Sequence, residues 1–218
     1  MKPSIIRLIL PLLCLCAVPS YSQEKLLFPY NSVEILPFNP HNWYTSVNAS
    51  ELEKLIRHKA IKVIVELGSW MGGSTRHMAS LLPKHGKVYA IDTWQGTLNE
   101  LDSHSKIYDL SKLYRQFLSN VIHATLTDKI IPIKMDTLEA ARIFVNLKPD
   151  LVYIDASHDE DSVYQDIQAW WPFVKDHGTM CGDDWDYHGV KKAVLKFATN
   201  NNLDVYGNAS FWMFINKQ

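Results

Sequence analysis

The chain has few of the residues that define several specialised classes of protein. Its 218 residues include only 3 Cys, 9 Gly and 10 Pro. So few cysteines exclude a disulfide-dense scaffold, and so little glycine and proline excludes collagen-like and low-complexity chains. Neither sign of charge predominates, because 22 Lys and Arg face 23 Asp and Glu. The basic excess of a nucleic-acid-binding protein is therefore missing, and we expect no nucleic-acid partner.

Long apolar runs are also scarce, and the one that stands out lies at the N-terminus. Residues 1–22 begin with Lys2 and Arg7, continue through an apolar run over 9–18, and end at Ser22. This run is shorter than the roughly 20 residues that cross a bilayer. It predicts a secretory signal peptide over 1–22, and hence a secreted or periplasmic protein without a stable membrane span after cleavage. The alternative is an uncleaved segment that tethers the chain to a membrane.

The composition of the remaining chain is that of a globular protein, with 47% hydrophobic and 21% charged residues overall. We divide it into an N-terminal arm and helix over 23–60 and one domain over 61–218. The arm is rich in aromatic residues, and a capping box of Ser50 and Glu53 predicts that its helix begins near residue 50. Cleavage of the signal would leave Cys181 as the last cysteine, which we expect to be buried in a strand.

From residue 61 onward, β-branched runs alternate with amphipathic segments. We expect parallel strands at 62–66, 87–92, 130–134, 150–154 and 179–182, with helices between them and one long helix over 107–125. Pro132 favours an edge position for the third strand. A hairpin over 203–215, turning at Gly207 and Asn208, closes the chain. The pattern predicts an α/β fold, doubly wound, with a mostly parallel Rossmann-like sheet and a C-terminal antiparallel hairpin.

An acidic residue stands at or just after the carboxyl end of every predicted parallel strand. In open α/β sheets ligands bind beyond this edge. A single aspartate there is often only a helix cap. A whole row of acids is costly to bury without partners, so the row predicts a binding site. Its members are Glu66, Asp92, Asp136, Asp155, and the pair Asp183 and Asp184.

A glycine-containing loop follows Glu66 and discriminates between cofactors. Its glycines are Gly68, Gly72 and Gly73, a spacing that differs from the G-x-G-x-x-G turn of dinucleotide sites. A carboxylate at Glu66 would repel a pyrophosphate, whereas it would attract the α-amino group of a sulfonium cofactor. The loop therefore favours S-adenosylmethionine (SAM) over NAD.

The same residues carry a resemblance to a known family. The run from Val65 to Ser74 resembles motif I of class I SAM-dependent methyltransferases. The block from Asp155 to Asp184 resembles a narrower group, the macrocin-type O-methyltransferases and the cephalosporin-hydroxylase-like proteins. The resemblance implies a class I methyltransferase fold for the domain. It also implies a methyltransferase activity.

The resemblance further implies a role for each matching residue. The methionine part of SAM would contact Glu66, Gly68 and Ser74, and Gly72 would also belong to the cofactor site. The nucleoside part would meet Asp92 at its ribose, Trp94 beside its adenine, and Asp136 near its adenine amino group. Magnesium-dependent O-methyltransferases of this fold place carboxylate ligands where Asp155, Asp183 and Asp184 stand, and oxygen ligands suit Mg²⁺.

The expected reaction is methyl transfer to a hydroxyl of a small molecule or sugar, assisted by Mg²⁺. The hydroxyl must lose its proton, and His158, three residues after Asp155, is the expected general base. The alternatives are a capping or core role for His158, a base at His188, and a simple cap at Asp183 and Asp184. A hydroxylase-like activity and a non-catalytic secreted protein that binds a ligand or partner also stay open, as does assembly into a homo-oligomer.

Overall fold

The computed structural model describes residues 26–96 and 105–217, and the predicted signal segment over 1–22 lies outside them. Seven strands form one sheet in the order β3-β2-β1-β4-β5-β7-β6. Its first five strands along the chain pair in parallel, and β7 runs antiparallel to both β5 and β6. The strands are β1 (Val63–Leu67), β2 (Lys87–Asp92), β3 (Ile130–Lys134), β4 (Leu151–Ile154), β5 (Thr179–Gly182), β6 (Leu203–Asn208) and β7 (Phe211–Asn216). The predicted fold class is confirmed.

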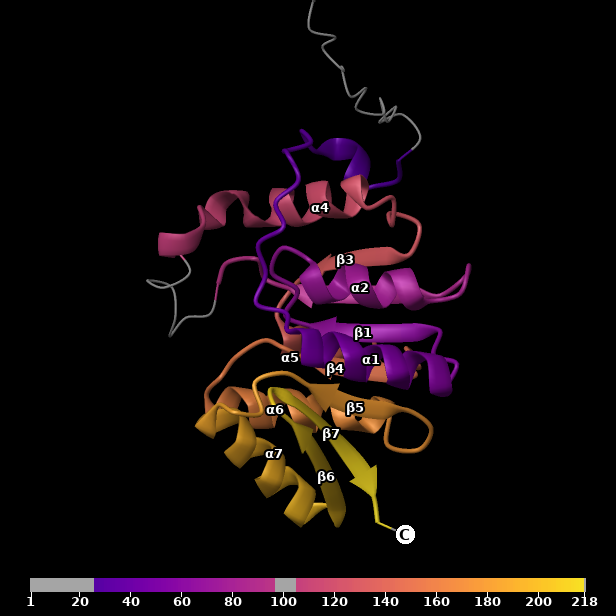
Figure 1. Cartoon of the computed structure of the whole chain (residues 1–218), viewed down its shortest axis with the longest axis vertical. Helices are drawn as coiled ribbons and strands as arrows, with labels where there is room; N and C mark the ends of the chain where they lie inside the picture. The colour runs from indigo at the N-terminus through magenta and orange to yellow at the C-terminus, as the bar shows by residue number, and fades with distance from the viewer. Residues whose placement is uncertain (1–25, 97–104, 218) are drawn as a thin grey trace, which may run out of the picture.

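Helices cover both faces of this sheet, as Figure 1 shows. The first face carries α1 (Ser46–His58), α2 (Gly73–Leu81) and α4 (Leu113–His123), and the second carries α5 (Thr137–Ile143), α6 (Glu160–Trp170) and α7 (His188–Asn200). The chain also forms the short 3-10 turns η2 (Tyr30–Ser32), η4 (Leu110–Lys112) and η5 (Trp171–Phe173). No helix within 26–96 and 105–217 is long and apolar enough to cross a membrane.

Two hydrophobic cores, one under each helix layer, hold the sheet in place. On β1, Ile64 packs into the first core, and Val65 and Leu67 pack into the second. This follows from the strand geometry, because successive side chains point to opposite faces. All four residues of β4 are buried, as expected for a strand covered on both faces. Cys181 is buried within β5, as predicted.

Three predicted positions differ from the structure by more than one residue. Helix α1 begins at Ser46, because the Thr45 side chain caps it by accepting a hydrogen bond from the Asn48 amide. The predicted helix over 107–125 is the 3-10 turn η4 followed by the shorter α4. The hairpin turn lies at residues 209–210, where Ala209 takes the left-handed conformation, so Gly207 and Asn208 belong to β6.

The N-terminal arm crosses α4 and passes the start of α2 before it enters α1 (Figure 1). Tyr30, at its beginning, is buried and donates a hydrogen bond from its hydroxyl to the carbonyl of Ile130 at 2.9 Å. This contact lies on β3, which forms the edge of the sheet as Pro132 predicted. The arm therefore joins the edge strand to the helices of the first face.

Candidate functional site

The parallel register gathers the predicted acids at one edge of the sheet. Strand β1 pairs with β2 on one side and with β4 on the other, and β4 pairs with β5. The carboxyl ends of these strands carry Glu66, Asp92, Asp155 and Asp183. The carbonyls of Leu67 and Ile154 accept from the amides of Asp155 and Asp183 at 2.8 and 3.0 Å, which extends the pairing up to the acids.

Glu66 is fully buried beneath the glycine loop. Its carboxyl oxygens accept hydrogen bonds from the hydroxyls of Ser69 at 2.7 Å, Ser74 at 2.5 Å, and Thr75. Burial raises the pKa of Glu66 to about 7, although the three hydroxyl donors act in the opposite direction. Glu66 therefore ties the loop to the first turn of α2. A direct contact between Glu66 and a cofactor stays a prediction.

The first two loop glycines allow the backbone to pass where a side chain could not. Gly68 has φ of 81°, and a Cβ added there would lie 1.9 Å from the carbonyl oxygen of Asp155. Gly72 has φ of 80° and precedes α2, with the Phe117 ring 3.1 Å from the position of its missing Cβ. Both positions need the conformational freedom of glycine. The loop is thereby held close to the end of β4, next to Asp155.

Asp92 organises the same loop from the end of β2. Its Oδ2 accepts from the amides of Ser69 at 2.8 Å and Trp70 at 2.9 Å, and its Oδ1 accepts from the amide of Trp94 at 2.7 Å. The Asp92 carboxylate thereby holds the backbone of the loop at two successive amides and the Trp94 amide next to its own strand. The geometry is compatible with the predicted ribose contact, which stays a prediction.

The structure differs from the sequence analysis at Trp94. We expected its ring beside an adenine, but the side chain is only 2% exposed. Its Nε1 donates to the carbonyl of Trp70 at 2.8 Å, and its ring packs against Tyr114 and Phe117 with centroids 4.6 and 4.8 Å away. Trp94 is a core residue because α4 provides an aromatic pocket for it. The sequence could not show that pocket.

Asp136 is exposed and caps α5 by accepting hydrogen bonds from the amides of Leu138 at 2.9 Å and Glu139 at 3.1 Å. This is the helix-capping role that the sequence left open for a single aspartate after a strand. A contact between Asp136 and an adenine amino group stays a prediction.

Asp155, Asp183 and Asp184 lie near enough to influence one another. Burial, followed by the charge of Asp183, raises the pKa of Asp155 well above its ordinary value. Burial and the charge of Asp184 likewise raise the pKa of Asp183. Asp183 also accepts from the Asp184 amide at 2.7 Å. Yet no three His, Cys, Asp or Glu side chains in the described part of the chain are grouped so as to hold a metal ion. As placed, these carboxylates do not fit the predicted Mg²⁺ site.

His158 pairs with an acid from the neighbouring strand. Its Nε2 lies 2.9 Å from Oδ2 of Asp184, and the two side chains are 24% and 21% exposed. The His158 ring also stacks on Tyr187, with centroids 4.7 Å apart. A partly exposed imidazole held by a carboxylate is the arrangement of a general base and its orienting group. The sequence alone did not predict this pairing or the contact with Tyr187, although the strands that precede His158 and Asp184 follow one another along the chain.

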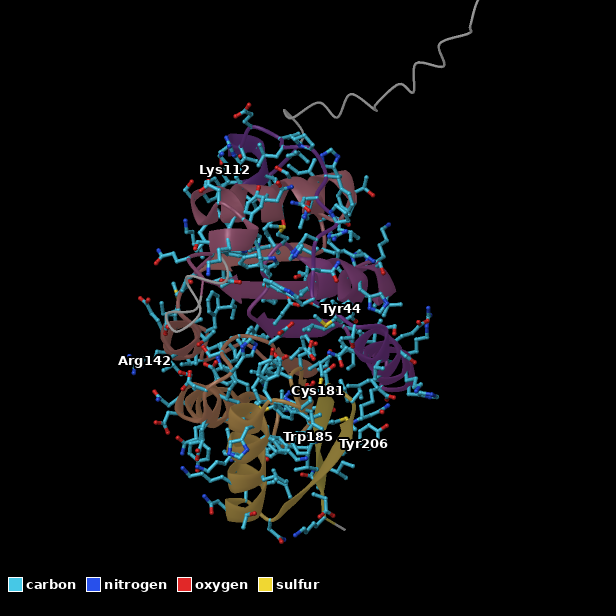
Figure 2. All side chains as sticks on the ribbon, turned by 60° about the vertical axis from the view of Figure 1, so that its left-hand side comes forward. Tyr44, Lys112, Arg142, Cys181, Trp185 and Tyr206 are labelled. Atoms are coloured by element: carbon cyan, nitrogen blue, oxygen red, sulfur yellow. The ribbon has the colours of Figure 1, made fainter. Side chains whose placement is uncertain are left out.

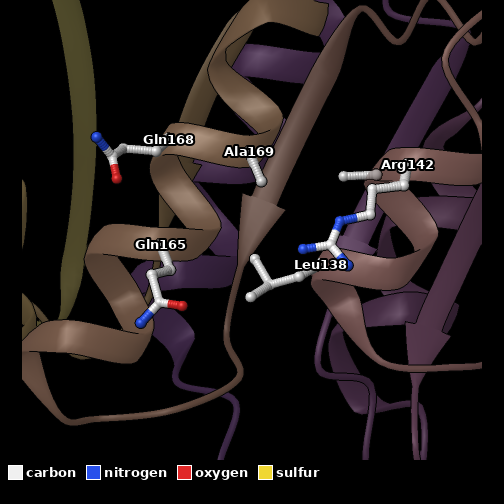
Figure 3. A pocket seen from close by; sticks show the side chains of 6 residues that line it. Leu138, Arg142, Gln165, Gln168 and Ala169 are labelled. Atoms are coloured by element: carbon white, nitrogen blue, oxygen red, sulfur yellow. The ribbon is translucent and has the colours of Figure 1, made fainter.

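A cavity of about 350 Å³ lies away from this edge, between α5 and α6. Figure 3 shows the side chains of Arg142 and Leu138 on one of its sides and those of Gln165, Gln168 and Ala169 on the other. None of the predicted site residues lines it. The candidate site is therefore the row of strand ends rather than this groove between helices.

The sequence matches a family model described as a methyltransferase domain over residues 65–185, which is more than half of the chain. The chain belongs to this methyltransferase-domain family. The matched region begins in β1 and ends just after β5, so it includes both the glycine loop and the His158–Asp184 pair. A search of curated proteins gave no match.

Solved structures with the same fold include several O-methyltransferases. A putative O-methyltransferase from Klebsiella pneumoniae has a TM-score of 0.62 at 15% identity, covering 83% of this chain and 84% of that one. An O-methyltransferase from Bacillus cereus in complex with SAH has a TM-score of 0.59 at 17% identity, covering 93% and 94%. One from Streptomyces achromogenes, involved in tomaymycin synthesis and in complex with SAM, has a TM-score of 0.59 at 14% identity, covering 80% and 82%.

Proposed function

We propose that this protein is a SAM-dependent O-methyltransferase that methylates a hydroxyl of a small molecule or sugar. The observation that carries the proposal is the juxtaposition at one sheet edge of the glycine loop, held by Glu66 and Asp92, and the His158–Asp184 pair. Structural neighbours crystallised with SAH and with SAM support the choice of cofactor. We also propose that it belongs to the narrower group of macrocin-type O-methyltransferases and cephalosporin-hydroxylase-like proteins, which the block from Asp155 to Asp184 resembles.

The glycine loop and Asp92 form the cofactor side of the proposed site. The tight backbone at Gly68 and Gly72 lets a ligand approach the main chain, and Asp92 holds the loop at the end of β2, where we place the ribose. When bound, SAM supplies an electrophilic methyl group. The main contribution of the protein is to hold this group in line with the acceptor oxygen, because positioning supplies much of the acceleration in such transfers.

His158 removes the acceptor proton in this proposal. Because Nε2 faces Asp184, the neutral tautomer that satisfies the pair carries its proton on Nε2, and we assign the acceptor proton to Nδ1. The proton of the acceptor hydroxyl would go to Nδ1, which would make the oxygen nucleophilic toward the methyl group that bound SAM would supply. Asp184 fixes the ring orientation and stabilises the imidazolium that forms.

Magnesium assistance is the part of the predicted function that the side-chain placement does not fit. Asp184 is engaged by His158, and no three His, Cys, Asp or Glu side chains within 26–96 and 105–217 are grouped as metal ligands. We therefore assign no step to Mg²⁺. Calorimetric titration with Mg²⁺ tests this assignment. Binding that is lost in the double variant Asp155→Ala with Asp183→Ala would restore the metal site, whereas no binding, or binding that survives the double variant, supports the metal-free reading.

Calorimetric titration of the purified protein with SAM tests the proposed function. We expect binding by the wild type and its loss in Asp92→Ala, because two loop amides and the Trp94 amide lose their acceptor at once. Asp204→Ala is the matched control, since Asp204 is an exposed acid on β6, far along the sheet from the site. Absence of SAM binding by the wild type, with and without Mg²⁺, would contradict the proposal.

The apolar N-terminal run supports a separate proposal, that the chain is exported and cleaved after Ser22. Export favours one alternative function, a ligand-binding protein without methyltransferase activity, because SAM is an intracellular metabolite. Mass spectrometry of the protein from the cell interior and from the exported fraction tests cleavage. A protein that begins at Met1 and stays inside the cell would contradict export and remove this alternative.

A further inference from the structure

One buried side chain joins the N-terminal arm to the glycine loop. The Asn120 side chain on α4 is fully buried. Its Oδ1 accepts from the Asn39 amide and from Nε2 of Gln116, both at 3.0 Å. Its Nδ2 donates to the carbonyls of Asn39 and Met71, both at 2.9 Å. A side-chain amide has two donor hydrogens and two acceptor sites, so Asn120 is used to capacity.

Residues 42–44 of the arm contact the loop and α2 at further points. A Cβ on Gly73 would lie 2.7 Å from Cβ of Asn42. The rings of Trp43 and Trp70 lie 4.9 Å apart, and the Tyr44 hydroxyl is 2.7 Å from Nδ1 of His77 on α2. Figure 2 places Tyr44 in the middle of the molecule, close to the sheet. The arm is therefore packed directly on the loop that the proposed function assigns to the cofactor.

The loop conformation that the arm contacts is a strained one. Trp70 has φ of 47°, in the left-handed region that side chains seldom adopt. The Trp70 amide donates to Asp92 on one side, and the carbonyl of its neighbour Met71 accepts from Asn120 on the other. Strained backbone persists only where its surroundings determine it. Asn120 is thus one of the groups that hold this conformation.

Other residues of α4 hold the arm without touching the loop. Ser119, which is also fully buried, accepts from the Leu36 amide through its hydroxyl at 2.9 Å. Its hydroxyl donates to the carbonyl of Arg115 within the same helix. The neighbouring positions Ser119 and Asn120 therefore separate the two possible roles. Ser119 anchors the arm alone, whereas Asn120 anchors the arm and the loop together.

We propose that Asn120 is a positioning residue, which couples the N-terminal arm to the glycine loop and thereby holds the loop in the conformation that binds SAM. This rests on the proposed function, because it takes the loop as the cofactor site. Replacing Asn120 by Asp puts a carboxylate oxygen against two carbonyl oxygens and leaves the Met71 carbonyl without its donor. Buried polar groups that lose their partner are costly, so the loop should move.

The test is calorimetric titration of SAM into the full chain carrying Asn120→Asp, Asn120→Ser or Ser119→Ala, with thermal unfolding recorded for each. The Ser variant, whose smaller side chain leaves room for a bridging water, keeps the test open if the Asp variant does not fold. We expect the Asn120 variants to bind SAM at least about tenfold more weakly, which corresponds to about 1.4 kcal/mol. Ser119→Ala should bind SAM within about twofold of the wild type. We expect this even if its midpoint of thermal unfolding falls as much as the midpoints of the Asn120 variants do.

The outcomes separate this inference from the proposed function. Wild-type affinity in Asn120→Ser, or an equal loss of affinity in Ser119→Ala, would overturn the coupling role of Asn120 while SAM binding by the wild type stands. No SAM binding by the wild type would overturn the proposed function itself, and this inference with it. Weak binding confined to the Asn120 variants supports both.

Discussion

Nε2 of His158 lies 2.9 Å from Oδ2 of Asp184, so the segments that follow β4 and β5 meet through these two side chains. Asp184 takes the left-handed conformation, with φ of 62°. Its backbone is stabilised locally, since its amide donates to Oδ1 of Asp183 at 2.7 Å. A histidine held in this way has one ring nitrogen committed and a fixed ring plane. That relationship is the basis of the first prediction.

His158→Ala should lower kcat while leaving the affinity for SAM close to that of the wild type. The lost group acts on the acceptor proton, and general base catalysis contributes about 100-fold to 10,000-fold. Asp184→Asn should lower kcat by a smaller factor, about tenfold, because an amide oxygen still accepts from Nε2 but without the charge that stabilises the imidazolium. Single-turnover methyl transfer to a panel of phenols and sugars measures both variants.

His188→Ala is the control for this prediction. His188 is the first residue of α7 and is exposed, and the sequence left it as a second candidate for the base. We expect wild-type kcat in this variant. A large loss of kcat in His188→Ala with little change in His158→Ala would move the base to the start of α7 and contradict the role of the pair.

The backbone requirement at Gly68 leads to the second prediction. Gly68→Ala should destabilise the protein more than Gly72→Ala does, although both glycines have φ near 80°. At Gly72 the new methyl group meets a ring 3.1 Å away, so the cost is chiefly that of the left-handed conformation, about 1–2 kcal/mol. At Gly68 it would lie 1.9 Å from a backbone oxygen, which has to move.

Urea unfolding of the two alanine variants measures the difference in the free energy of unfolding. Because the obstructing atom is the Asp155 carbonyl, the movement at Gly68 should also disturb the end of β4 and weaken SAM binding. Equal stabilities of the two variants would show that the loop lies farther from β4 than the structure places it.

The sequence was sufficient to predict the sheet because its strands carry their own signals. β-branched runs mark β1 and β4, and Pro132 marks an edge strand. The acids that follow the strands gather at one edge of the sheet because the strands pair in parallel. The loop glycines were likewise readable, since their spacing after Glu66 is local. These features depend on residues near one another in the chain, or on a regular alternation.

The features that escaped prediction depend on partners from distant elements. Trp94 looked like a ligand-stacking aromatic because its pocket is built by α4, which lies later in the chain. Asn120 gave no signal at all, because its importance comes from meeting Asn39 and Met71. The start of α1 was misplaced because Thr45 and Ser50 are both good caps, and only packing decides between them.

The third prediction concerns pH and a buried acid outside the proposed site. Asp166 on α6 is buried and accepts a hydrogen bond from the Thr137 hydroxyl at 2.5 Å. Burial raises its pKa from 3.8 to about 7, and the charges of Asp136 and Asp159 act in the same direction. Between about pH 4 and 7 the folded protein therefore keeps a proton on Asp166 that the unfolded chain has already released. Over this window the free energy of unfolding must fall as pH rises, by at most about 1.4 kcal/mol per pH unit for one group.

Asp166→Asn should remove this contribution, because an amide stays neutral and its oxygen still accepts from Thr137. Glu66, with a pKa of about 7, contributes a slope of the same sign in both proteins, so only the difference between variant and wild type reports on Asp166. We expect the variant to gain stability relative to the wild type as the pH is raised from 4.5 to 7.5, with the gain levelling off above about 7. Urea unfolding at several pH values measures it, with the exposed Asp204→Asn as the control that should follow the wild type. Parallel profiles for Asp166→Asn and the wild type would mean that Asp166 ionises in the folded protein near its ordinary pKa, and that the contact between α5 and α6 holds a charge rather than a proton.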